Sequence, residues 1–447
     1  AIDGGFDAVI GNPPWVRPHA VAPSEREALR ARFVSLREAA WLPGAESAGA
    51  GRGFASQADL SALFIERGVH LLRPEGVLAF LVPAKLWRSL SGGGIRRVLA
   101  SHAPALALEE WTADRAGFDA AVYPSLLLAR RSDRPAPSVR VTHHRSEARA
   151  TWTVPRHTLA LDETDGAPWL AIPPAVRAAV DRLVSAGVPL ASTGLGRPLL
   201  GVKSGCNEAF VVRRGADVAP GLTTVQSGEA QGAVERQSLR PILRGEQCRA
   251  WGADPDDGEA IVWTHGASGA PVTTLPLATS RWLGRWRRRL ERRSDARQDA
   301  WWALFRTEAA ATDGPRVVWA DIGRTPRALV LPAADPRVPL NTCYVLRPPT
   351  EADAHALAAL LNAPIIAAWL RVLAEPARGG YRRFLGWTCA RLPVPRDWAR
   401  ARSLLAPVGR AGAAGQPVPD GVLDALVADG FGVPIDALAP LRDWSGG

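Results

Sequence analysis

The chain has 447 residues, more than one ordinary hydrophobic core contains, so two or three domains are expected. Hydrophobic residues make up 47% and charged residues 22%, and no uninterrupted apolar run is long enough to cross a bilayer, which argues against a membrane-spanning protein. The formal net charge of +10 favours a polyanionic partner, either nucleic acid or an anionic membrane surface, while the arginine bias of a GC-rich genome is an equally good explanation of the excess.

Strands and helices alternate in the first part of the chain. The first strand, 6–10, is expected to be buried, and Ser24 is expected to cap the first helix. Hydrophobic periodicity predicts strands at 6–10, 77–82, 106–111 and 123–129, and helices at 24–36, 58–72 and 95–100. Two glycine-rich stretches, 43–57 and Gly92-Gly93-Gly94, are expected to be loops. This alternation predicts an α/β fold with a mostly parallel, doubly wound sheet, whose active edge lies at the carboxyl ends of its strands.

The character of the sequence changes after about residue 130. Residues 190–345 predict strands and loops interrupted by one basic helix, and further helices are expected at 176–186, 351–373 and 420–429. We therefore expect four segments: an α/β domain at 1–135, a connection at 136–190, a mixed α+β domain at 191–400 and a helical tail at 401–447.

The chain has four widely spaced cysteines without a C-x-x-C pair: Cys206, Cys248, Cys343 and Cys389. A zinc site or a disulfide framework is therefore not expected, and the pattern fits the reducing cytoplasm. The adjacent histidines His143 and His144, for which the sequence shows no carboxylate partners, are expected to be surface residues and not metal ligands.

Asn12-Pro13-Pro14-Trp15 directly follows the first predicted strand. One interpretation is a rigid Pro-Pro turn with a tryptophan packed beneath it. The position at the ligand edge of an α/β sheet favours a functional interpretation.

Residues 6–15 resemble the catalytic motif of amino-methyltransferases that act on adenine in DNA. Residues 71–83 are similar to the helix-to-strand passage that follows in that family. Residues 117–125 resemble the later motif whose aromatic side chain lines the adenine pocket. The resemblance thus implies S-adenosylmethionine as cofactor and Phe118 as a pocket residue, although plain core packing of Phe118 remains an alternative.

The chemistry of amine methylation accounts for these residue types. The exocyclic amine of adenine is a poor nucleophile because its lone pair is delocalised into the ring. The carboxamide oxygen of Asn12 and the main-chain carbonyl of Pro13 would accept its two N–H groups and stabilise the positive charge that develops. Pro14 follows Pro13, and consecutive prolines fix the backbone. Trp15 would stack on the flipped base, which is worth about 1–3 kcal/mol. Asn12 is also expected to contact the methyl donor.

The later part of the chain resembles another region of the same enzymes. Residues 201–210 are similar to the opening of the target-recognition domain in large restriction–modification methyltransferases, including type IIG and phage-defence enzymes. Four shorter motifs continue this likeness in order: 240–245, 341–344, 360–363 and 392–395. The resemblance implies that 1–135 is the C-terminal half of a catalytic domain and that 191–400 recognises double-stranded DNA, with Lys203 and Arg244 among its contacts.

The sequence departs from the family pattern in the part that should bind the methyl donor. The resemblance implies a glycine-rich donor-binding loop, and an acidic residue that holds the donor's ribose, before the first strand. Only eleven residues precede Asn12, and Gly92-Gly93-Gly94 follows a helix-like segment on the wrong side of the motif. We therefore expect the donor-binding segment to come from upstream in the gene product or from a partner chain, and residues 1–447 alone not to methylate DNA.

Residues 279–293 predict a basic helix. Its apolar stripe is formed by Trp282, Leu283, Trp286 and Leu290. The other face carries Arg285, Arg288, Arg289 and Arg292. This face is either simply solvated or contacts the phosphates along the DNA backbone. Trp301-Trp302, close by, is expected to belong to the core.

Three hypotheses follow. The leading one is an adenine-N6 DNA methyltransferase with its own recognition domain and no membrane partner. The second is a DNA-binding specificity module with a non-catalytic methyltransferase remnant, which the absent donor loop favours for this chain taken alone. The third is methylation of a glutamine side chain in a protein, against which the long basic region after the motif argues.

Overall fold

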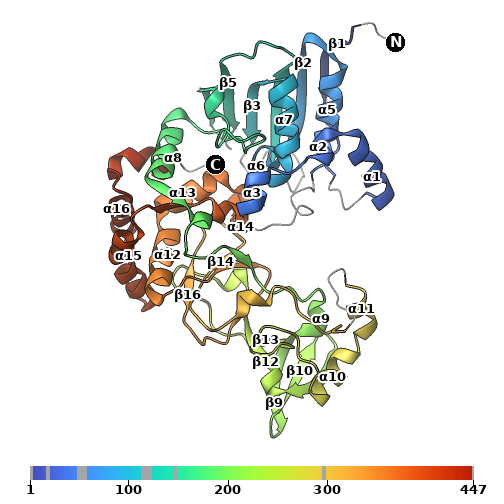
Figure 1. Cartoon of the computed structure of the whole chain (residues 1–447), viewed down its shortest axis with the longest axis vertical. Helices are drawn as coiled ribbons and strands as arrows, with labels where there is room; N and C mark the ends of the chain where they lie inside the picture. The colour runs from blue at the N-terminus through green and yellow to red at the C-terminus, as the bar shows by residue number, and fades with distance from the viewer. Residues whose placement is uncertain are drawn as a thin grey trace.

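A computed structural model describes residues 4–16, 21–47, 58–111, 123–144, 148–293 and 299–444. Figure 1 shows three regions: a sheet with covering helices that contains the N-terminal part of the chain, a group of helices formed mostly by the C-terminal part, and a β-rich region at the far end of the long axis. The predicted α/β class is confirmed.

The first sheet has six strands in the order β1-β2-β4-β3-β5-β6. Their bounds are β1 Phe6–Gly11, β2 Leu72–Pro83, β3 Ala105–Trp111, β4 Pro124–Arg130, β5 Ser138–His144 and β6 Arg149–Pro155. Only β1–β2 and β3–β5 pair in parallel, so the sheet is mixed and not mostly parallel as expected. Because β5 and β6 belong to this sheet, the boundary expected at residue 135 falls inside it.

Strand β1 lies at the edge of this sheet (Figure 1). We expected it to be buried, but most of its residues are exposed: Ile10 is 80% exposed and Phe6 39% exposed. An apolar strand with one unpaired edge presents free backbone groups together with apolar surface, which is unusual unless another element covers it.

The helices around the first sheet are α1 Pro23–Arg32, α2 Val34–Arg37, α3 Leu42–Ser47, α5 Ser61–Leu71, α6 Lys85–Arg88 and α7 Gly93–His102. Ser24 is not a cap, because α1 begins at Pro23, whose fixed φ suits the first turn. The expected helix 24–36 breaks at Phe33, where the backbone is extended. In the stretch 43–57, residues 43–47 belong to α3, and 48–57 lie outside the described residues.

Gly92-Gly93-Gly94 is helical and not a loop as expected, because it ends a short 3-10 turn and begins α7. A Cβ on Gly93 would lie 2.6 Å from the Trp41 nitrogen, and one on Gly94 would lie 2.7 Å from the Ser35 carbonyl oxygen. The glycines therefore let the first turn of α7 approach the backbone of residues 35–41.

The helical region is formed by α8 Pro174–Ala186, α12 Glu351–Asn362, α13 Pro364–Leu373, α14 Gly386–Ala390, α15 Trp398–Ala413, α16 Asp420–Phe431 and α17 Ala439–Asp443. The short strands β7 (Gly187–Pro189) and β21 (Pro393–Pro395) pair beside it. The hydrophobic core of this region combines residues from many segments, the first being Trp41 and the last Leu441. No single described helix is long and apolar enough to cross a membrane; α12 and α13 meet that test only as a pair, which is bent by 70° and largely buried in this core.

The β-rich region contains two sheets, β11-β10-β9-β13-β12-β17 and β16-β14-β18-β8. The bounds are β8 Leu199–Leu200, β9 Val211–Ala219, β10 Leu222–Ser227, β11 Ala230–Glu235, β12 Leu239–Leu243, β13 Glu259–Val262, β14 Arg316–Ala320, β16 Leu329–Leu331, β17 Val338–Pro339 and β18 Cys343–Leu346. A third sheet, β15 (Ile322–Gly323), β20 (Tyr381–Arg383) and β19 (Glu375–Ala377), joins this region to the helical one. Helix α9 (Asn207–Phe210) precedes β9.

The predicted basic helix is two helices, α10 (Leu277–Gly284) and α11 (Arg287–Glu291). Gly284, a poor helix former, ends α10, and Trp286 leaves helical geometry with φ −107° and ψ 8°. The apolar stripe holds across the break, because Trp282 and Leu290 are buried and Trp286 packs against the same core. Trp301 and Trp302 also contribute to this core, as predicted.

Candidate functional site

The segment Asn12-Pro13-Pro14-Trp15 leaves the carboxyl end of β1. Pro13 is buried, Trp15 is half-buried, and the side chains of Asn12 and Pro14 are exposed. The Trp15 indole Nε1 donates to the Leu81 carbonyl oxygen of β2 at 3.4 Å. The backbone is therefore anchored to the neighbouring strand while the carboxamide of Asn12 stays accessible.

The same segment is anchored on its other side by α5. The Leu60 amide, just before α5, donates to the Val16 carbonyl oxygen at 3.0 Å. The preceding residue, Asp59, is buried and accepts from the amide and the hydroxyl of Ser61. The Leu60–Val16 bond therefore ties the chain just after the motif to the start of α5.

An ion pair that the sequence analysis missed lies beside the motif. Lys85 Nζ, just after β2, is 2.9 Å from Asp59 Oδ2. Burial raises the pKa of the Glu375 carboxyl in β19, although the charges of Arg383, Lys85 and Arg96 oppose this shift. Lys85 is one of only two lysines in the chain, which was the one available signal.

Tyr123 connects this edge of the sheet to the C-terminal part of the chain. Its carbonyl oxygen accepts from the Ala84 amide at 2.9 Å, and its hydroxyl accepts from the Gly380 amide at 3.2 Å. The hairpin of β19 and β20 therefore reaches the edge that carries Asn12. Phe118, the predicted second pocket residue, lies outside the described residues.

His143 and His144 are not surface residues as expected. His143 is 2% exposed, and its Nε2 lies 3.4 Å from Glu110 Oε2; His144 Nε2 lies 2.7 Å from Glu109 Oε2. Parallel pairing of β3 with β5 places Glu110 opposite His143, which brings the carboxylates to the histidines. Among the described residues, no group of three or more His, Cys, Asp or Glu side chains is arranged to hold a metal ion.

Glu110 is the centre of a buried charge network. Arg88 donates to both of its carboxylate oxygens, at 2.8 and 2.9 Å. Burial alone would raise the pKa of Glu110, but Arg88 and His143 hold this pKa well below its ordinary range. Burial lowers the pKa of Arg382 in β20 to about 9. Trp444 packs on His143, and the free space left in the network is about 10 Å³, so we assign it a structural role.

The two other predicted contacts of the β-rich region are constrained by the fold. Arg244 is partly buried and pairs with Glu259 Oε2 at 2.9 Å, which favours a structural role. Lys203 is half-buried, with its ammonium 6.0 Å from the centroid of the Phe305 ring.

The four predicted arginines of α10 and α11 are all exposed. Arg285 Nη1 donates to the Gln231 carbonyl oxygen at 2.7 Å, and Arg289 Nη2 lies 3.1 Å from Glu208 Oε1. Arg288 and Arg292 lie toward the end of the helical segment. All four cations thus stay exposed despite the break at Trp286, and whether they contact DNA phosphates stays a prediction.

Comparisons with known proteins agree with the resemblance drawn from the sequence. Residues 1–108 match the family described as the Eco57I restriction-modification methylase. The type II methyltransferase M.PaeR7I of Pseudomonas aeruginosa is 25% identical over 227 residues, which cover 47% of this chain and 36% of that protein. The chain thus corresponds to little more than a third of this relative's length.

Among solved structures, the type IIL restriction-modification enzyme MmeI, determined in complex with DNA, has a TM-score of 0.61 at 13% identity. The match covers 98% of this chain and 56% of MmeI, so the likeness of fold extends over all three regions. Residues 1–108 are thus similar to the Eco57I restriction-modification methylase, within a fold similar to that of a type IIL restriction-modification enzyme.

Proposed function

We propose that this protein is a site-specific DNA methyltransferase of a restriction–modification or phage-defence system, acting in the cytoplasm. It would transfer a methyl group from S-adenosylmethionine to N6 of adenine in duplex DNA. The observation that carries the proposal is the exposed carboxamide of Asn12 beside the buried Pro13 at the carboxyl end of β1, in a motif whose Trp15 is anchored to β2. The β-rich region would supply target recognition.

In this mechanism the target adenine leaves the base stack and presents its amine to the motif. Asn12 Oδ1 and the Pro13 carbonyl oxygen accept the two N–H groups, which favours tetrahedral geometry at the nitrogen and stabilises the charge that develops there. Because the anchors at Leu81 and Leu60 fix the backbone, little reorganisation accompanies the reaction. Trp15 is only half-buried, so part of its indole stays available to stack on the base.

S-adenosylmethionine, when bound, supplies an electrophilic methyl group on a sulfonium centre. The residues present fit a donor next to Asn12, because no strand among the described residues pairs with the outer edge of β1 and Ile10 and Phe6 expose apolar surface. Asn12 would contact the donor from this chain. We propose that a donor-binding segment, from the same gene product or from a partner chain, covers this edge and completes the sheet.

The test is methyl transfer from tritiated S-adenosylmethionine to duplex DNA by the protein with its donor-binding segment, followed by nucleoside analysis. We expect the label in N6-methyladenine. Label in a cytosine derivative, or in glutamine of a protein acceptor, would overturn the proposal. Sequence-selective DNA binding without any transfer, by protein that binds the donor, would instead support the specificity-module hypothesis.

Neutralising the arginines of α10 and α11 is expected to weaken binding to any DNA sequence. In a variant with glutamine at Arg285, Arg288, Arg289 and Arg292, the slope of log K against log salt should become shallower by about 0.9 for each lost phosphate contact. Fluorescence anisotropy at several salt concentrations measures this slope.

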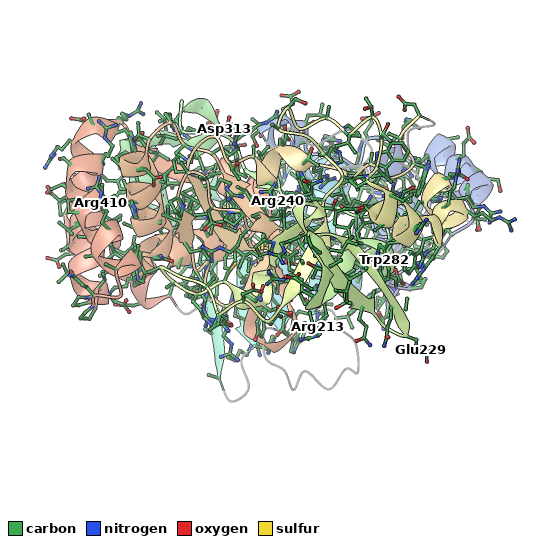
Figure 2. The ribbon with its side chains drawn as sticks, turned by 90° about the horizontal axis from the view of Figure 1, so that it is seen from below. Arg213, Glu229, Arg240, Trp282, Asp313 and Arg410 are labelled. Carbon is green, nitrogen blue, oxygen red and sulfur yellow. The ribbon has the colours of Figure 1, made fainter. Side chains whose placement is uncertain are left out.

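The matched control replaces Arg400 and Arg410 of α15 by glutamine. Arg410 lies on the opposite side of the molecule from Trp282 of α10 (Figure 2). This control should leave the slope unchanged. If the four-residue variant also keeps its slope, the face is merely solvated.

A further inference from the structure

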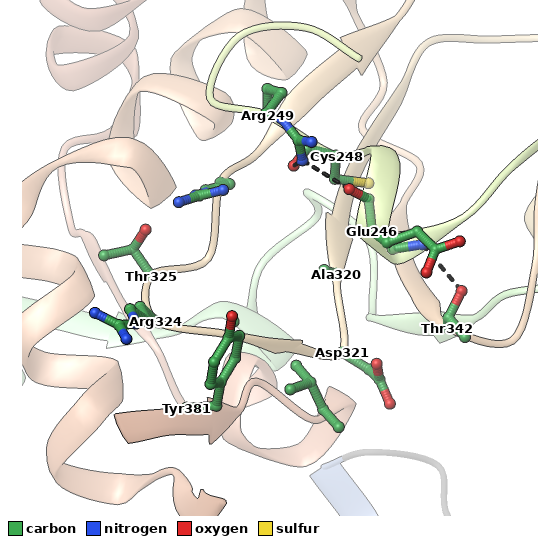
Figure 3. A pocket seen from close by; sticks show the side chains of 13 residues that line it. Glu246, Cys248, Arg249, Ala320, Asp321, Arg324, Thr325, Thr342 and Tyr381 are labelled. Carbon is green, nitrogen blue, oxygen red and sulfur yellow. Dashed lines mark hydrogen bonds between the residues drawn. The ribbon is translucent and has the colours of Figure 1, made fainter. Parts of the chain in front are cut away.

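A cavity of about 710 Å³ opens between the β-rich region and the hairpin of β19 and β20. Its walls come from the loop that follows β15, from residues 245–249 and from the hairpin, and they meet around an open centre (Figure 3). The volume lies within the range of about 300–1,000 Å³ that ligand sites occupy. Tyr381, which is 42% exposed, borders the cavity one residue after Gly380, whose amide contacts Tyr123. The hairpin that borders the cavity is therefore linked through Tyr123 to the end of β2, the strand that pairs with β1.

The lining offers both hydrogen-bond donors and acceptors. Arg249, Arg324 and Arg327 supply guanidinium groups, and Glu246 and Asp321 supply carboxylates. A phosphate needs donors only, whereas the edges of base pairs present acceptors on guanine and donors on cytosine and adenine. The mixed lining thus suits base edges better than the DNA backbone.

Two of the arginines are available for a ligand. Arg324 and Arg327 are exposed, and within the described parts of the chain neither has a carboxylate within 4.0 Å. Arg249, in contrast, pairs with Asp254 and donates to two nearby carbonyl oxygens. The guanidinium carbon of Arg324 lies 5.7 Å from the centroid of the Tyr381 ring. A guanidinium with free N–H groups beside an aromatic ring is well suited to bind the O6 and N7 acceptors of guanine.

The loop that carries these arginines is held in a fixed shape. Arg327 has a φ of 50°, in the left-handed region that non-glycine residues rarely occupy. The Asn362 carboxamide clamps the next residue, because its oxygen accepts from the Ala328 amide at 2.7 Å and its nitrogen donates to the Ala328 carbonyl at 2.8 Å. The Trp251 amide donates to the same carbonyl at 2.9 Å. A strained backbone that is fixed this closely indicates a preorganised site.

Two of the recognition-domain motifs line this cavity, and a third supports the loop that carries Arg327. Gly245, from the motif 240–245, donates its amide to Thr342 Oγ1 at 2.9 Å, and a Cβ there would lie 2.4 Å from the Thr342 carbonyl oxygen. Thr342, from the motif 341–344, accepts from the Asp321 amide through its carbonyl. Asn362 belongs to the motif 360–363. Gly245 and Thr342 therefore form part of the wall, and Asn362 holds the backbone next to Arg327 from behind it.

We infer that Arg324 and Arg327 determine sequence specificity by reading guanine edges of the target duplex in this cavity, with Asn362 as a positioning residue. The inference rests on the proposed function only in taking duplex DNA as the partner. It does not require methyl transfer.

The test is equilibrium binding of the full chain to a randomised duplex library, which gives the base preference at each position without any catalytic step. Arg324→Ala and Arg327→Ala should each lower the preference for guanine at one position by about 5- to 150-fold, while binding to unrelated DNA changes little. Arg327→Lys is the discriminating variant, because it keeps the charge and loses the planar fork. It should lose the preference as fully as Arg327→Ala.

Arg306→Ala is the matched control, since Arg306 is also exposed with a left-handed φ of 60° but does not line the cavity. It should leave every base preference intact. If Arg324→Ala and Arg327→Ala weaken all sequences equally and Arg327→Lys restores affinity, the arginines contact phosphates and the inference is wrong. It is equally wrong if the unmodified chain binds DNA without sequence preference, whatever the outcome for methylation.

Discussion

Replacing Asn12 by alanine is expected to abolish methyl transfer, with a loss of at least about 10²- to 10³-fold, the scale measured when one preorganised polar group is removed from a transition state. DNA affinity should stay within a few-fold, because Asn12 acts on the reacting amine and not on the phosphate backbone. Its side chain is exposed, so the truncation leaves no cavity in the core. Single-turnover transfer from tritiated donor, beside a binding titration of the same protein, measures both quantities.

Asn12→Asp is the matched control. It keeps an acceptor oxygen at the same position and should therefore retain measurable transfer that Asn12→Ala lacks. Substantial activity in the alanine variant, or loss of DNA binding parallel to the loss of activity, would contradict the assigned role.

The largest expected effect on stability is that of Glu110→Leu. Arg88 and Glu110 are both buried and pair through two hydrogen bonds, so the substitution leaves the Arg88 guanidinium without its counter-charge in the interior. Breaking such a pair costs about 3–5 kcal/mol. Urea unfolding followed by circular dichroism should show this loss in the free energy of unfolding. The double variant Arg88→Met with Glu110→Leu should recover most of it, because neither charge then remains buried.

Glu109→Gln serves as the control. Glu109 is next to Glu110 in the sequence, but it is partly exposed and pairs with His144. Glu109→Gln should lower the free energy of unfolding much less than Glu110→Leu does. A Glu110→Leu protein as stable as the control would mean that the network is not packed as described.

The same carboxyl makes a specific contribution to acid sensitivity. Because the folded state lowers the pKa of Glu110 below its ordinary value of 4.5, its contribution to stability is fully present above that pH and declines as the pH falls toward the folded-state pKa. Below pH 4.5 the unmodified protein should therefore lose stability more steeply than Glu110→Leu.

Local patterns in the sequence predicted much of the fold. The strand before Asn12, the strand 77–82 and the helix around Ile95 all appear, because each is specified by the periodicity of its own residues. The pairing between strands was not predictable in this way. His143 and Glu110 are distant in the sequence, and only the parallel register of β3 and β5 makes them partners. The break at Trp286 was missed because the apolar stripe continues through it.

The residues of the candidate site that are contiguous in the sequence could be predicted, and those brought together by folding could not. Asn12 to Trp15 form a continuous motif, and sequence alone located them. Lys85 with Asp59, and the cavity around Arg324, are built from segments that meet only in the folded chain. No local pattern near Arg324 distinguishes it from the many other arginines of a basic chain.

The position of Trp444 has a consequence for how the protein is made. Its ring packs against both His143 and Trp152, at centroid distances of 5.5 and 5.7 Å. Synthesis on the ribosome proceeds from the N-terminus, so the strands of the first sheet emerge long before the residue that covers their buried charges. His143 and Trp152 therefore lack the covering ring of Trp444 until nearly the whole described chain has been translated. Contacts between residues this far apart in the sequence form slowly, so we expect the layer over His143 and Trp152 to be among the last parts of the first sheet to close.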